Sequence, residues 1–599
     1  MELARTFDLM ENYKGVYGYK QDAIVAKEQG FWVKYTAEDY VSSVNYISYG
    51  LIASGLKKGD RIATISNNRP EWNFMDMGMS QAGIVHVPVY PTLSDEDYIF
   101  ILNHAEPSLL LISDRTLCDR ICPIAMKVSS IKGIYTFNEI EGVRNWKEIL
   151  ETGRANEDKY KELLEKLKKD IIPDDLLTII YTSGTTGNPK GVMLSHHNIM
   201  SNVESISQIF DFNHTQRTLS FLPISHVFER TINYYFQKTG ISIYYAENLG
   251  TIADNLREIK PHVFITVPRL LERVYDRIIG KGKDLKGIKK QIFFWAVNLG
   301  LKYKLNNKNS WLYKQRLKIA RRLVFSKWCE ALGGNVELIV AGGAALQPRL
   351  AVIFNAAGIP VVEGYGMTEA APVIAANRPP DKNEVRLGTV GPAIPGVQIK
   401  IADDGEILCR GDNVMLGYYK ETELTREVID SDGWLHTGDI GVLEDNMFLK
   451  ITDRKKEMFK LSSGKYIAPQ TIENKLKESF FIEQAMVVGE NEKFASALIS
   501  PNFQFLHNWC SIHGVKYRDN KDLIQDPEII ERFQREVNQI NDLLGITEQI
   551  KRFRLVDEEW SPLTGELSPT LKLKRKFLSE KYKSILAGIY FMSKSNGTA

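Results

Sequence analysis

Apolar runs of strand length alternate with longer amphipathic stretches through most of the chain. This alternation predicts parallel strands joined by helical crossovers. Residues 61–66 and 83–90 are predicted strands. Thr36 and Asp39 have the spacing of a helix N-cap and its return bond, so a helix is expected to begin there and to run to about Ser54. The pattern therefore favours the α/β class.

The size and composition of the chain narrow its possible roles. At 599 residues it is too long for one hydrophobic core, so two or more domains are expected. Hydrophobic residues make up 44% and charged residues 25%, and the net charge of +2 provides no overall field for nucleic acid. Five cysteines, a sparse and odd set, favour a reducing compartment. No signal peptide and no apolar run of about 18 residues is present, so a cytoplasmic protein is expected.

One segment departs from this even charge balance. Residues 281–330 contain 14 Lys or Arg and 2 Asp or Glu, which leaves 62 basic and 72 acidic residues, a net charge of −10, in the rest of the chain. Aromatic and aliphatic residues are interleaved with the basic ones. Two interpretations stay open: a helical pair with one buried and one solvated basic face, or a surface that docks on anionic lipid. Nucleic-acid binding is disfavoured because no recognition motif accompanies the charge.

A loop rich in glycine and threonine follows the predicted strand 176–181. Residues 182–187 read Thr-Ser-Gly-Thr-Thr-Gly, Lys190 follows, and 192–194 is the next predicted strand. Glycine allows backbone N–H groups to converge, and the hydroxyl groups add donors, so the composition suits an oligophosphate. The spacing differs from the Walker pattern G-x-x-x-x-G-K-[ST]. A plain turn is the alternative.

Further glycine turns follow other predicted strands. Residues 338–345 read Leu-Ile-Val-Ala-Gly-Gly-Ala-Ala, and residues 363–369 read Glu-Gly-Tyr-Gly-Met-Thr-Glu. Tyr365 offers a ring on which a purine can stack, and Glu369 offers an oxygen ligand for Mg²⁺. Asp439, after another glycine turn, can hold ribose hydroxyls. Taken singly, each motif has a structural alternative, a tight turn or an Asx-turn.

In this order the motifs resemble those of the adenylate-forming enzymes, which include acyl-CoA synthetases, adenylation domains and luciferases. The string Phe-Leu-Pro-Ile-Ser-His-Val-Phe-Glu-Arg at 221–230 and the N-terminal segments 55–61 and 68–72 also resemble this family. The resemblance covers nearly the whole chain. The 221–230 string and the basic stretch resemble the long-chain fatty acid–CoA ligases in particular.

The catalytic-lysine loop of the family is matched by residues 565–575. Lys572 takes the position of the lysine. Many members have Ser-Gly before this lysine, where this chain has Thr570-Leu571, a variant common in the long-chain fatty acid branch. Lys574 is the alternative register.

The resemblance implies a role for each matched position. The expected catalytic residues are Lys572, Glu369 and His226, the last between the nucleotide and acyl pockets. The expected ATP-binding residues are Thr182, Ser183, Gly184, Thr185, Thr186, Gly187, Lys190, Gly343, Ala344, Tyr365, Gly366, Thr368, Asp439 and Arg454. The expected Mg²⁺ ligands are Thr182 and Glu369. The expected residues of the hinge and of thioesterification are Lys456 at the pivot, Lys460 and Gly464.

The resemblance also implies a fold and a reaction. It predicts a large N-terminal domain of α/β subdomains over 1–452, a hinge over 453–456 and a small mobile α+β domain over 457–599. A fatty acid would react with ATP to give an acyl-adenylate and pyrophosphate, and coenzyme A would then displace AMP, with Mg²⁺ as cofactor.

Other functions remain open. An acyl–acyl carrier protein synthetase would share the first step, and the acid could be another carboxylic acid. A non-catalytic nucleotide or lipid sensor is disfavoured because Glu369, Asp439 and Lys572 are intact. Residues 281–330 could contact an acyl carrier protein or the inner face of an anionic membrane.

Overall fold

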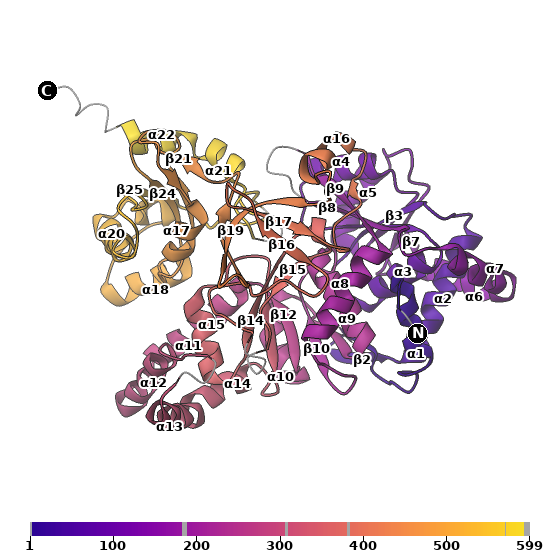
Figure 1. The fold of residues 1–599 in the computed structure, drawn as a ribbon, viewed down its shortest axis with the longest axis horizontal. Helices are drawn as coiled ribbons and strands as arrows, with labels where there is room; N and C mark the ends of the chain where they lie inside the picture. The colour runs from indigo at the N-terminus through magenta and orange to yellow at the C-terminus, as the bar shows by residue number, and fades with distance from the viewer. Residues whose placement is uncertain are drawn as a thin grey trace. The chain divides into compact units, whose positions relative to one another are not determined.

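The computed structural model describes residues 3–182, 188–305, 309–379, 384–562, 564–568 and 571–591 (Figure 1). The chain divides into two compact units, each with its own core. Unit 1 comprises Met1–Lys400, Leu408–His436 and Asp445–Leu449, and unit 2 comprises Ile401–Ile407, Thr437–Glu444 and Lys450–Ala599. The architecture is α/β with a larger and a smaller part, as predicted.

Two eight-stranded sheets form the framework of unit 1. The first has the order β15 (Val373–Ala376), β14 (Val361–Gly366), β13 (Leu338–Ala341), β12 (Val263–Thr266), β10 (Arg217–Ser220), β11 (Ser242–Tyr245), β1 (Ile24–Glu28) and β2 (Phe31–Tyr35). The second has the order β18 (Gly417–Tyr418), β9 (Lys190–Ser195), β8 (Leu176–Thr182), β4 (Val85–Val89), β3 (Arg61–Ile65), β5 (Leu109–Ile112), β6 (Gly133–Thr136) and β7 (Arg144–Asn145). In both sheets the central strands are parallel and antiparallel strands lie at an edge.

Helices connect and cover these strands, as the sequence pattern predicts. They are α1 (Leu9–Lys14), α2 (Ala37–Ala53), α3 (Pro70–Gln81), α4 (Asp95–Ala105), α5 (Arg115–Ala125), α6 (Lys147–Ala155), α7 (Glu157–Asp170), α8 (His196–Ile209), α9 (Val227–Thr239), α10 (Ile252–Ile259), α11 (Pro268–Lys283), α12 (Gly287–Gly300), α13 (Trp311–Ala320), α14 (Ser326–Ala331), α15 (Pro348–Ala357) and α16 (Thr422–Val428).

The predicted start of α2 is confirmed in atomic detail. The backbone N–H of Asp39 donates to the Thr36 hydroxyl at 3.0 Å, and the backbone N–H of Thr36 donates to the Asp39 carboxylate at 2.9 Å. Two N–H groups that the first helical turn leaves without partners are thereby satisfied. The strands expected at 61–66 and 83–90 are β3 and β4.

A four-stranded sheet has the order β16 (Gln398–Ile401), β17 (Glu406–Arg410), β19 (Leu435–Glu444) and β20 (Phe448–Arg454). The boundaries between the residue ranges of the two units fall within these strands or at their ends.

Unit 2 is built on a three-stranded sheet whose two faces are both apolar. The strands are β23 (Ile482–Val488), β24 (Ser496–Pro501) and β25 (Arg552–Leu555), and a small hairpin comprises β21 (Phe459–Lys460) and β22 (Tyr466–Ile467). Along β24, Ala497 and Ile499 belong to one buried cluster and Leu498 to another, as the alternation of strand side chains requires. Its helices are α17 (Pro469–Leu476), α18 (Phe503–His513), α19 (Asn520–Leu523), α20 (Pro527–Asn541), α21 (Arg575–Lys581) and α22 (Lys583–Phe591).

Among its described residues, the basic segment 281–330 is helical except at 284–286, 301–305 and 309–310. It includes the end of α11, then α12, α13, a π-helical turn at Arg321–Phe325 and α14. In the described part of the chain, no helix is both long enough and apolar enough to span a bilayer.

Candidate active site

The predicted phosphate loop connects an antiparallel strand pair. Thr182 ends β8 and lies opposite Lys190, which begins β9. The strands predicted on both sides of the loop are therefore present, and they hold Thr182 and Lys190 at its two ends. The predicted phosphate-binding residues Ser183, Gly184, Thr185, Thr186 and Gly187 lie outside the described residues.

Tyr418 brings two predicted site residues together. It pairs with Val192 as β18 adds to the edge strand β9. Its hydroxyl donates a 2.8 Å hydrogen bond to Oε1 of Glu369, and Nζ of Lys190 lies 5.3 Å from its ring centroid. A cation over an aromatic face is attracted by the ring quadrupole. Burial, with a contribution from Glu369, raises the pKa of Tyr418 well above its usual value, so the hydroxyl stays a donor at neutral pH.

Glu369 is positioned by a tight turn after β14. It lies in the short 3₁₀ helix Thr368–Ala370, and its carbonyl oxygen accepts from the backbone N–H of Met415 at 2.9 Å. A Cβ at Gly366 would lie 1.8 Å from the carbonyl oxygen of Pro372, so glycine is required there. Tyr365, in β14, is half-buried beside this turn.

The second glycine turn lies beside the start of α9. Gly343 has φ +81°, and both Gly343 and Ala344 are exposed after β13. A Cβ at Gly342 would come within 3.0 Å of the Phe228 ring. His226 is the N-cap of α9, and its Nδ1 accepts from the backbone N–H of Phe228 at 3.0 Å. The ring of Phe228, two residues after His226, therefore packs against the glycine turn predicted to meet the nucleotide.

The residues predicted to face the ribose are in contact within unit 2. The Nε of Arg454 donates to Oδ1 of Asp439 at 3.0 Å, between strands β20 and β19. Asp439 is buried and the guanidinium group is partly exposed. The pair was inferred from two motifs 15 residues apart, and its contact agrees with a shared role.

The predicted hinge, 453–456, spans the last two residues of β20 and the turn that follows. Lys456 is exposed there, and the neighbouring Lys455 is paired with Glu406 at 2.8 Å. Lys460 is exposed in β21, with Nζ 5.6 Å from the Tyr466 ring centroid. Gly464 has φ +82° in the turn that joins β21 to β22.

The backbone of Lys572 is hydrogen-bonded to Ser568 in unit 2. Its backbone N–H donates to the Ser568 hydroxyl at 3.0 Å, and its carbonyl oxygen accepts from the Ser568 N–H at 2.7 Å. Leu567 and Leu573 form an antiparallel bridge around the turn, and Leu567 is buried in the apolar cluster of the sheet. The Lys572 side chain is exposed, so this register is available for chemistry. Lys574 precedes α21, and its N–H donates to the carbonyl oxygen of Glu566.

Comparison with known proteins agrees with these motifs. The sequence pattern of the AMP-binding enzyme family matches residues 16–419, and that of the AMP-binding enzyme C-terminal domain matches residues 456–593. The chain belongs to the AMP-binding enzyme family.

Relatives align over most of their length. The long-chain-fatty-acid–CoA ligase FadD15 of Mycobacterium bovis is 31% identical over 94% of this chain and 93% of its own. Long-chain-fatty-acid–CoA ligase 1 of Homo sapiens is 32% identical over 93% of this chain and 82% of its own. The crystal structure of a carboxylate reductase adenylation domain from Mycobacterium chelonae matches with a TM-score of 0.75 at 21% identity, over 98% of this chain and 91% of that one, which supports the AMP-binding fold.

The oxygen donors of this AMP-binding enzyme fit Mg²⁺. Glu369 uses Oε1 to accept the Tyr418 hydrogen bond, so a ligand position remains at its other oxygen, and Thr182 offers a hydroxyl at the end of β8. Mg²⁺ prefers oxygen ligands and usually combines one or two protein groups with phosphate oxygens and water. Glu369 and Thr182 would hold the ion, which would neutralise charge between the phosphates.

A buried ionic cluster supports the strand that carries the phosphate loop. Arg230, which is 0% exposed, donates to Asp76 at 2.5 Å and to the Thr178 hydroxyl of β8 at 2.7 Å. Asp76 also accepts from His86 Nδ1 at 2.7 Å and from the Tyr234 hydroxyl. This cluster ties α9, which follows His226, to β8, which ends at the loop. Its contacts could not be predicted from the sequence, because its members come from four separate elements.

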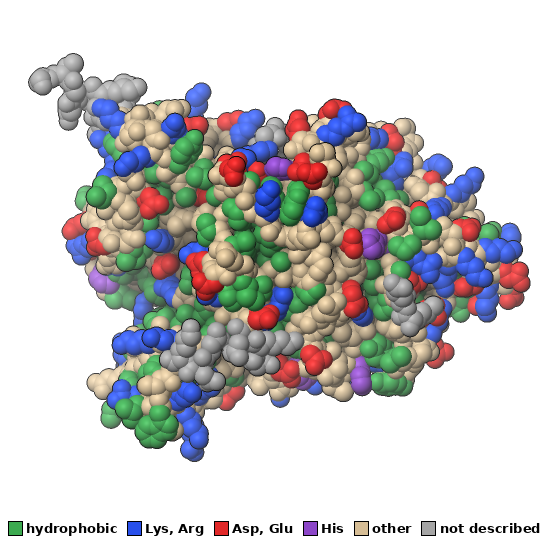
Figure 2. All heavy atoms as spheres, viewed as in Figure 1, with side chains coloured by type: hydrophobic (Ala, Val, Ile, Leu, Met, Phe, Trp, Pro, Cys, Tyr) green, Lys and Arg blue, Asp and Glu red, His purple; other side chains and the backbone are tan. Residues whose placement is uncertain are grey.

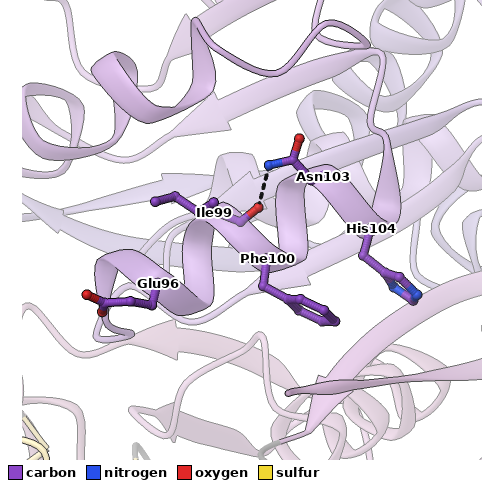
Figure 3. Close-up of a pocket in the computed structure, with 5 residues that line it drawn as sticks. All are labelled: Glu96, Ile99, Phe100, Asn103 and His104. Carbon is purple, nitrogen blue, oxygen red and sulfur yellow. Dashed lines mark hydrogen bonds between the residues drawn. The ribbon is translucent and has the colours of Figure 1, made fainter. Parts of the chain in front are cut away.

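A shallow pocket lies along α4 (Figure 3). Its volume is about 490 Å³, and it is lined by Glu96, Ile99, Phe100, Asn103 and His104. Phe100 and His104 point to the same side of the helix, with their rings stacked at 5.3 Å. The Nδ1 of His104 is 2.7 Å from the hydroxyl of Tyr181, the residue before Thr182. No predicted site residue is among these five, so the pocket adjoins Tyr181 in β8 but is not the predicted nucleotide site.

Proposed function

We propose that this AMP-binding enzyme is an ATP-dependent long-chain fatty acid–CoA ligase. It joins a fatty acid to AMP with release of pyrophosphate, and then transfers the acyl group to coenzyme A with release of AMP. The observation that carries the proposal is the placement of Lys190 and Glu369 on the two sides of Tyr418, beside the phosphate loop. Full-length relatives that are named long-chain-fatty-acid–CoA ligases support the acid and the acceptor.

The residues matched to the family motifs bind the nucleotide in this proposal. The 182–187 loop and Lys190 bind the β- and γ-phosphates, whose charge they offset. Gly343, Ala344, Gly366 and Thr368 border the nucleotide, and Tyr365 stacks on adenine. Asp439 accepts hydrogen bonds from the ribose hydroxyls, with Arg454 holding its carboxylate in place.

In the first half-reaction a carboxylate oxygen of the fatty acid forms a bond to the α-phosphorus, and the bond to pyrophosphate breaks. Two anions approach each other, so the site must supply positive charge and donors where charge concentrates. Lys572 bridges the acyl oxygen and the α-phosphate, and His226 lies between the acyl and nucleotide pockets.

In the second half-reaction the thiol of coenzyme A attacks the acyl carbonyl carbon, and AMP leaves. Lys572 would obstruct that approach, so the small domain turns about Lys456 and presents another face, where Lys460 and the turn at Gly464 meet coenzyme A. Such rearrangements allow one chain to run two steps with different requirements.

The test is a paired measurement of pyrophosphate and acyl-CoA, with Mg²⁺, ATP, coenzyme A and acids from acetate to a chain of about 20 carbons, since a pocket discriminates between acids by the methylenes it buries. Glu369→Gln is the matched inactive control. Both products should peak together at long chains. Pyrophosphate release without acyl-CoA formation, together with acyl transfer to a holo-carrier protein, would show that the acceptor is a carrier protein and not coenzyme A. Activity that peaks at a short or aromatic acid would show that the substrate is not a long-chain fatty acid.

We further propose that the basic segment 281–330 contacts an anionic membrane from which the fatty acid is taken. On the α13 side Leu312, Ile319 and Leu323, spaced seven and four residues apart, are each more than half exposed. Residues at these spacings share one helix face. The helix packs through Leu317 and Ala320, which are buried, so the three exposed apolar side chains are not part of its packed face.

The charge of the segment suits this partner. Figure 2 shows Lys and Arg side chains beside apolar ones over the helices that Figure 1 labels α12 and α13. Trp311 is 69% exposed at the start of α13, and aromatic rings favour the interfacial region of a bilayer. Each basic group near an anionic surface adds about 1 kcal/mol of attraction. An acidic acyl carrier protein is the alternative partner. It would complement the positive charge of the segment, but it would leave the exposed apolar side chains of α13 without a role.

A further inference from the structure

Arg575 is the centre of a partly buried ionic cluster in unit 2, three residues after Lys572. Its Nη2 donates to both carboxylate oxygens of Glu473, at 2.8 and 2.7 Å, and its Nε donates to Oε2 of Glu457 at 2.9 Å. The two carboxylates are 5% and 15% exposed and the guanidinium is 21% exposed. Charge-assisted bonds with this degree of burial hold geometry more firmly than surface pairs.

The two carboxylates belong to different parts of the fold. Glu457 directly follows Lys456, and its Oε2 also accepts from the Gln470 side chain at 3.0 Å. Glu473 lies on α17, and its Oε1 accepts from the backbone N–H of Val487 in β23 at 2.7 Å. One guanidinium group therefore joins the turn at Lys456, helix α17 and the start of α21.

The Lys572 turn has an anchor on each side. Before Lys572, Ser568 bonds its backbone twice and Leu567 is buried. After it, Arg575 begins α21, whose Leu578 is buried in the same apolar cluster as Leu567. A shift of the Arg575 contacts would be passed to Lys572 through only three residues of chain.

We propose that Arg575 is a positioning residue that couples the turn at Lys456 to the Lys572 loop. When the small domain rotates at this turn, the ionic contacts of Arg575 keep the Lys572 loop in a fixed position relative to the turn. This inference rests on the proposed two-step ligase reaction. Arginine suits the task because its planar group contacts two carboxylates at once, which a lysine ammonium group cannot do in the same geometry. Without the guanidinium, Glu457 and Glu473 would repel each other and the buried Asp453 carboxyl group nearby.

The experiment compares Arg575→Gln with the wild-type enzyme in the two half-reactions measured separately. Adenylation is followed as single-turnover pyrophosphate release, and thioesterification as acyl-CoA formed from pre-made acyl-adenylate. We expect kcat for adenylation to fall roughly 10- to 100-fold with little change in KM for ATP, because a misplaced group costs transition-state stabilisation and not ground-state binding. Thioesterification should stay within about twofold, since Lys572 does not take part in it.

Arg532→Gln is the matched control. Arg532 lies on α20 of the same unit, is 31% exposed, pairs with Glu536 and packs over the Phe481 ring, so its contacts are outside the Arg575 cluster. Its loss should lower thermal stability like that of Arg575 but leave both half-reactions unchanged. Arg575→Lys should restore stability more fully than adenylation.

Three results would overturn the proposal: equal loss in both half-reactions, an unchanged adenylation rate, or the same selective loss in Arg532→Gln. If Arg575→Gln fails to fold, Glu457→Ala gives the test, because it removes the contact to the turn and leaves Arg575 paired with Glu473. Failure of the proposed function would be seen separately, as a wild-type enzyme that releases no pyrophosphate with any fatty acid.

Discussion

The hydroxyl of Tyr418 donates to Oε1 of Glu369 at 2.8 Å, while the face of the same ring lies 5.3 Å from Nζ of Lys190. One side chain thus orients the carboxylate expected to bind Mg²⁺ and borders the cation expected to bind phosphate. The hydrogen bond leaves the other Glu369 oxygen to face a ligand. The ring limits the volume in which the ammonium group can move.

Tyr418→Phe should therefore weaken the use of Mg²⁺–ATP. The substitution removes the hydrogen bond and keeps the ring, and a hydrogen bond to a charged group contributes about 1.5–3 kcal/mol, so kcat/KM should fall roughly tenfold or more. Mn²⁺ binding in the presence of ATP, followed by electron paramagnetic resonance, should weaken in parallel. Tyr419→Phe is the control, because Tyr419 packs edge-on against His104 and has no contact with Glu369 in the described structure. Equal effects of the two substitutions would refute a role for the Tyr418 hydroxyl.

Lys572→Ala should separate the two half-reactions. Removal of one charged group from the transition state costs about 3–4 kcal/mol, so pyrophosphate release should slow by roughly 10²–10³. Acyl-CoA formation from pre-made acyl-adenylate should continue. Lys574→Ala is the matched control and tests the register of the loop at the same time. Selective loss of adenylation in Lys574→Ala, with Lys572→Ala unaffected, would move the catalytic role two residues along the chain.

Local signals and long-range contacts differ in what the sequence could reveal. The capping pair Thr36 and Asp39 was predictable because both partners lie within one helical turn. Asp439 and Arg454 were inferred from family motifs, and the structure brings them into contact. Tyr418 could not be inferred in this way, because it reaches Lys190 only when β18 pairs with a strand more than 200 residues earlier.

The buried cluster around Arg230 was unpredictable for the same reason. A periodicity argument places a charged residue of a helix on the solvent side, yet Arg230 is fully buried by partners from α3, β4, β8 and α9. One signal was present: the 221–230 string, in which Glu229 and Arg230 follow His226, resembles that of the long-chain ligases. The resemblance indicated the family but predicted none of the contacts of Arg230, because those contacts depend on tertiary packing.

The neighbouring Glu229 should make stability depend on pH. Burial raises the pKa of its carboxyl group to about 8, against a weaker opposing effect of the hydrogen bond from Ser220 at 2.5 Å. The folded state then keeps a proton that the unfolded state releases near its ordinary pKa. The stabilising contribution is complete below that ordinary pKa and is lost as pH rises toward 8, at about 1.4 kcal/mol per pH unit.

Glu229→Gln should remove this contribution to the pH dependence, because the amide stays neutral and its oxygen can still accept from Ser220. Chemical denaturation at several pH values between about 5.5 and 8 measures the slopes, which linkage relates to proton uptake. The variant should show a shallower fall than the wild type and be the more stable protein at the upper end. Identical slopes would mean that Glu229 is ionised in the folded protein.

If residues 281–330 bind a lipid surface, apolar contact and charge should each contribute to binding, and the two contributions can be measured separately. Replacing Ile319 and Leu323 by Gln removes apolar contact area without changing charge, while Lys318→Gln with Arg322→Gln removes charge and keeps that area.

On vesicles of phosphatidylcholine and phosphatidylglycerol, each pair of substitutions should reduce co-sedimentation of the protein by roughly five- to thirtyfold, the effect of 1–2 kcal/mol. Binding of the charge variant should be less sensitive to salt than binding of the variant that keeps its charge, because screening acts on the electrostatic part. Ile546→Ser is the control, since Ile546 is an 81% exposed apolar residue that does not belong to the segment. Wild-type binding that ignores both salt and anionic lipid would contradict the membrane proposal, and loss of acyl transfer to a carrier protein in the charge variant alone would favour the carrier protein as partner.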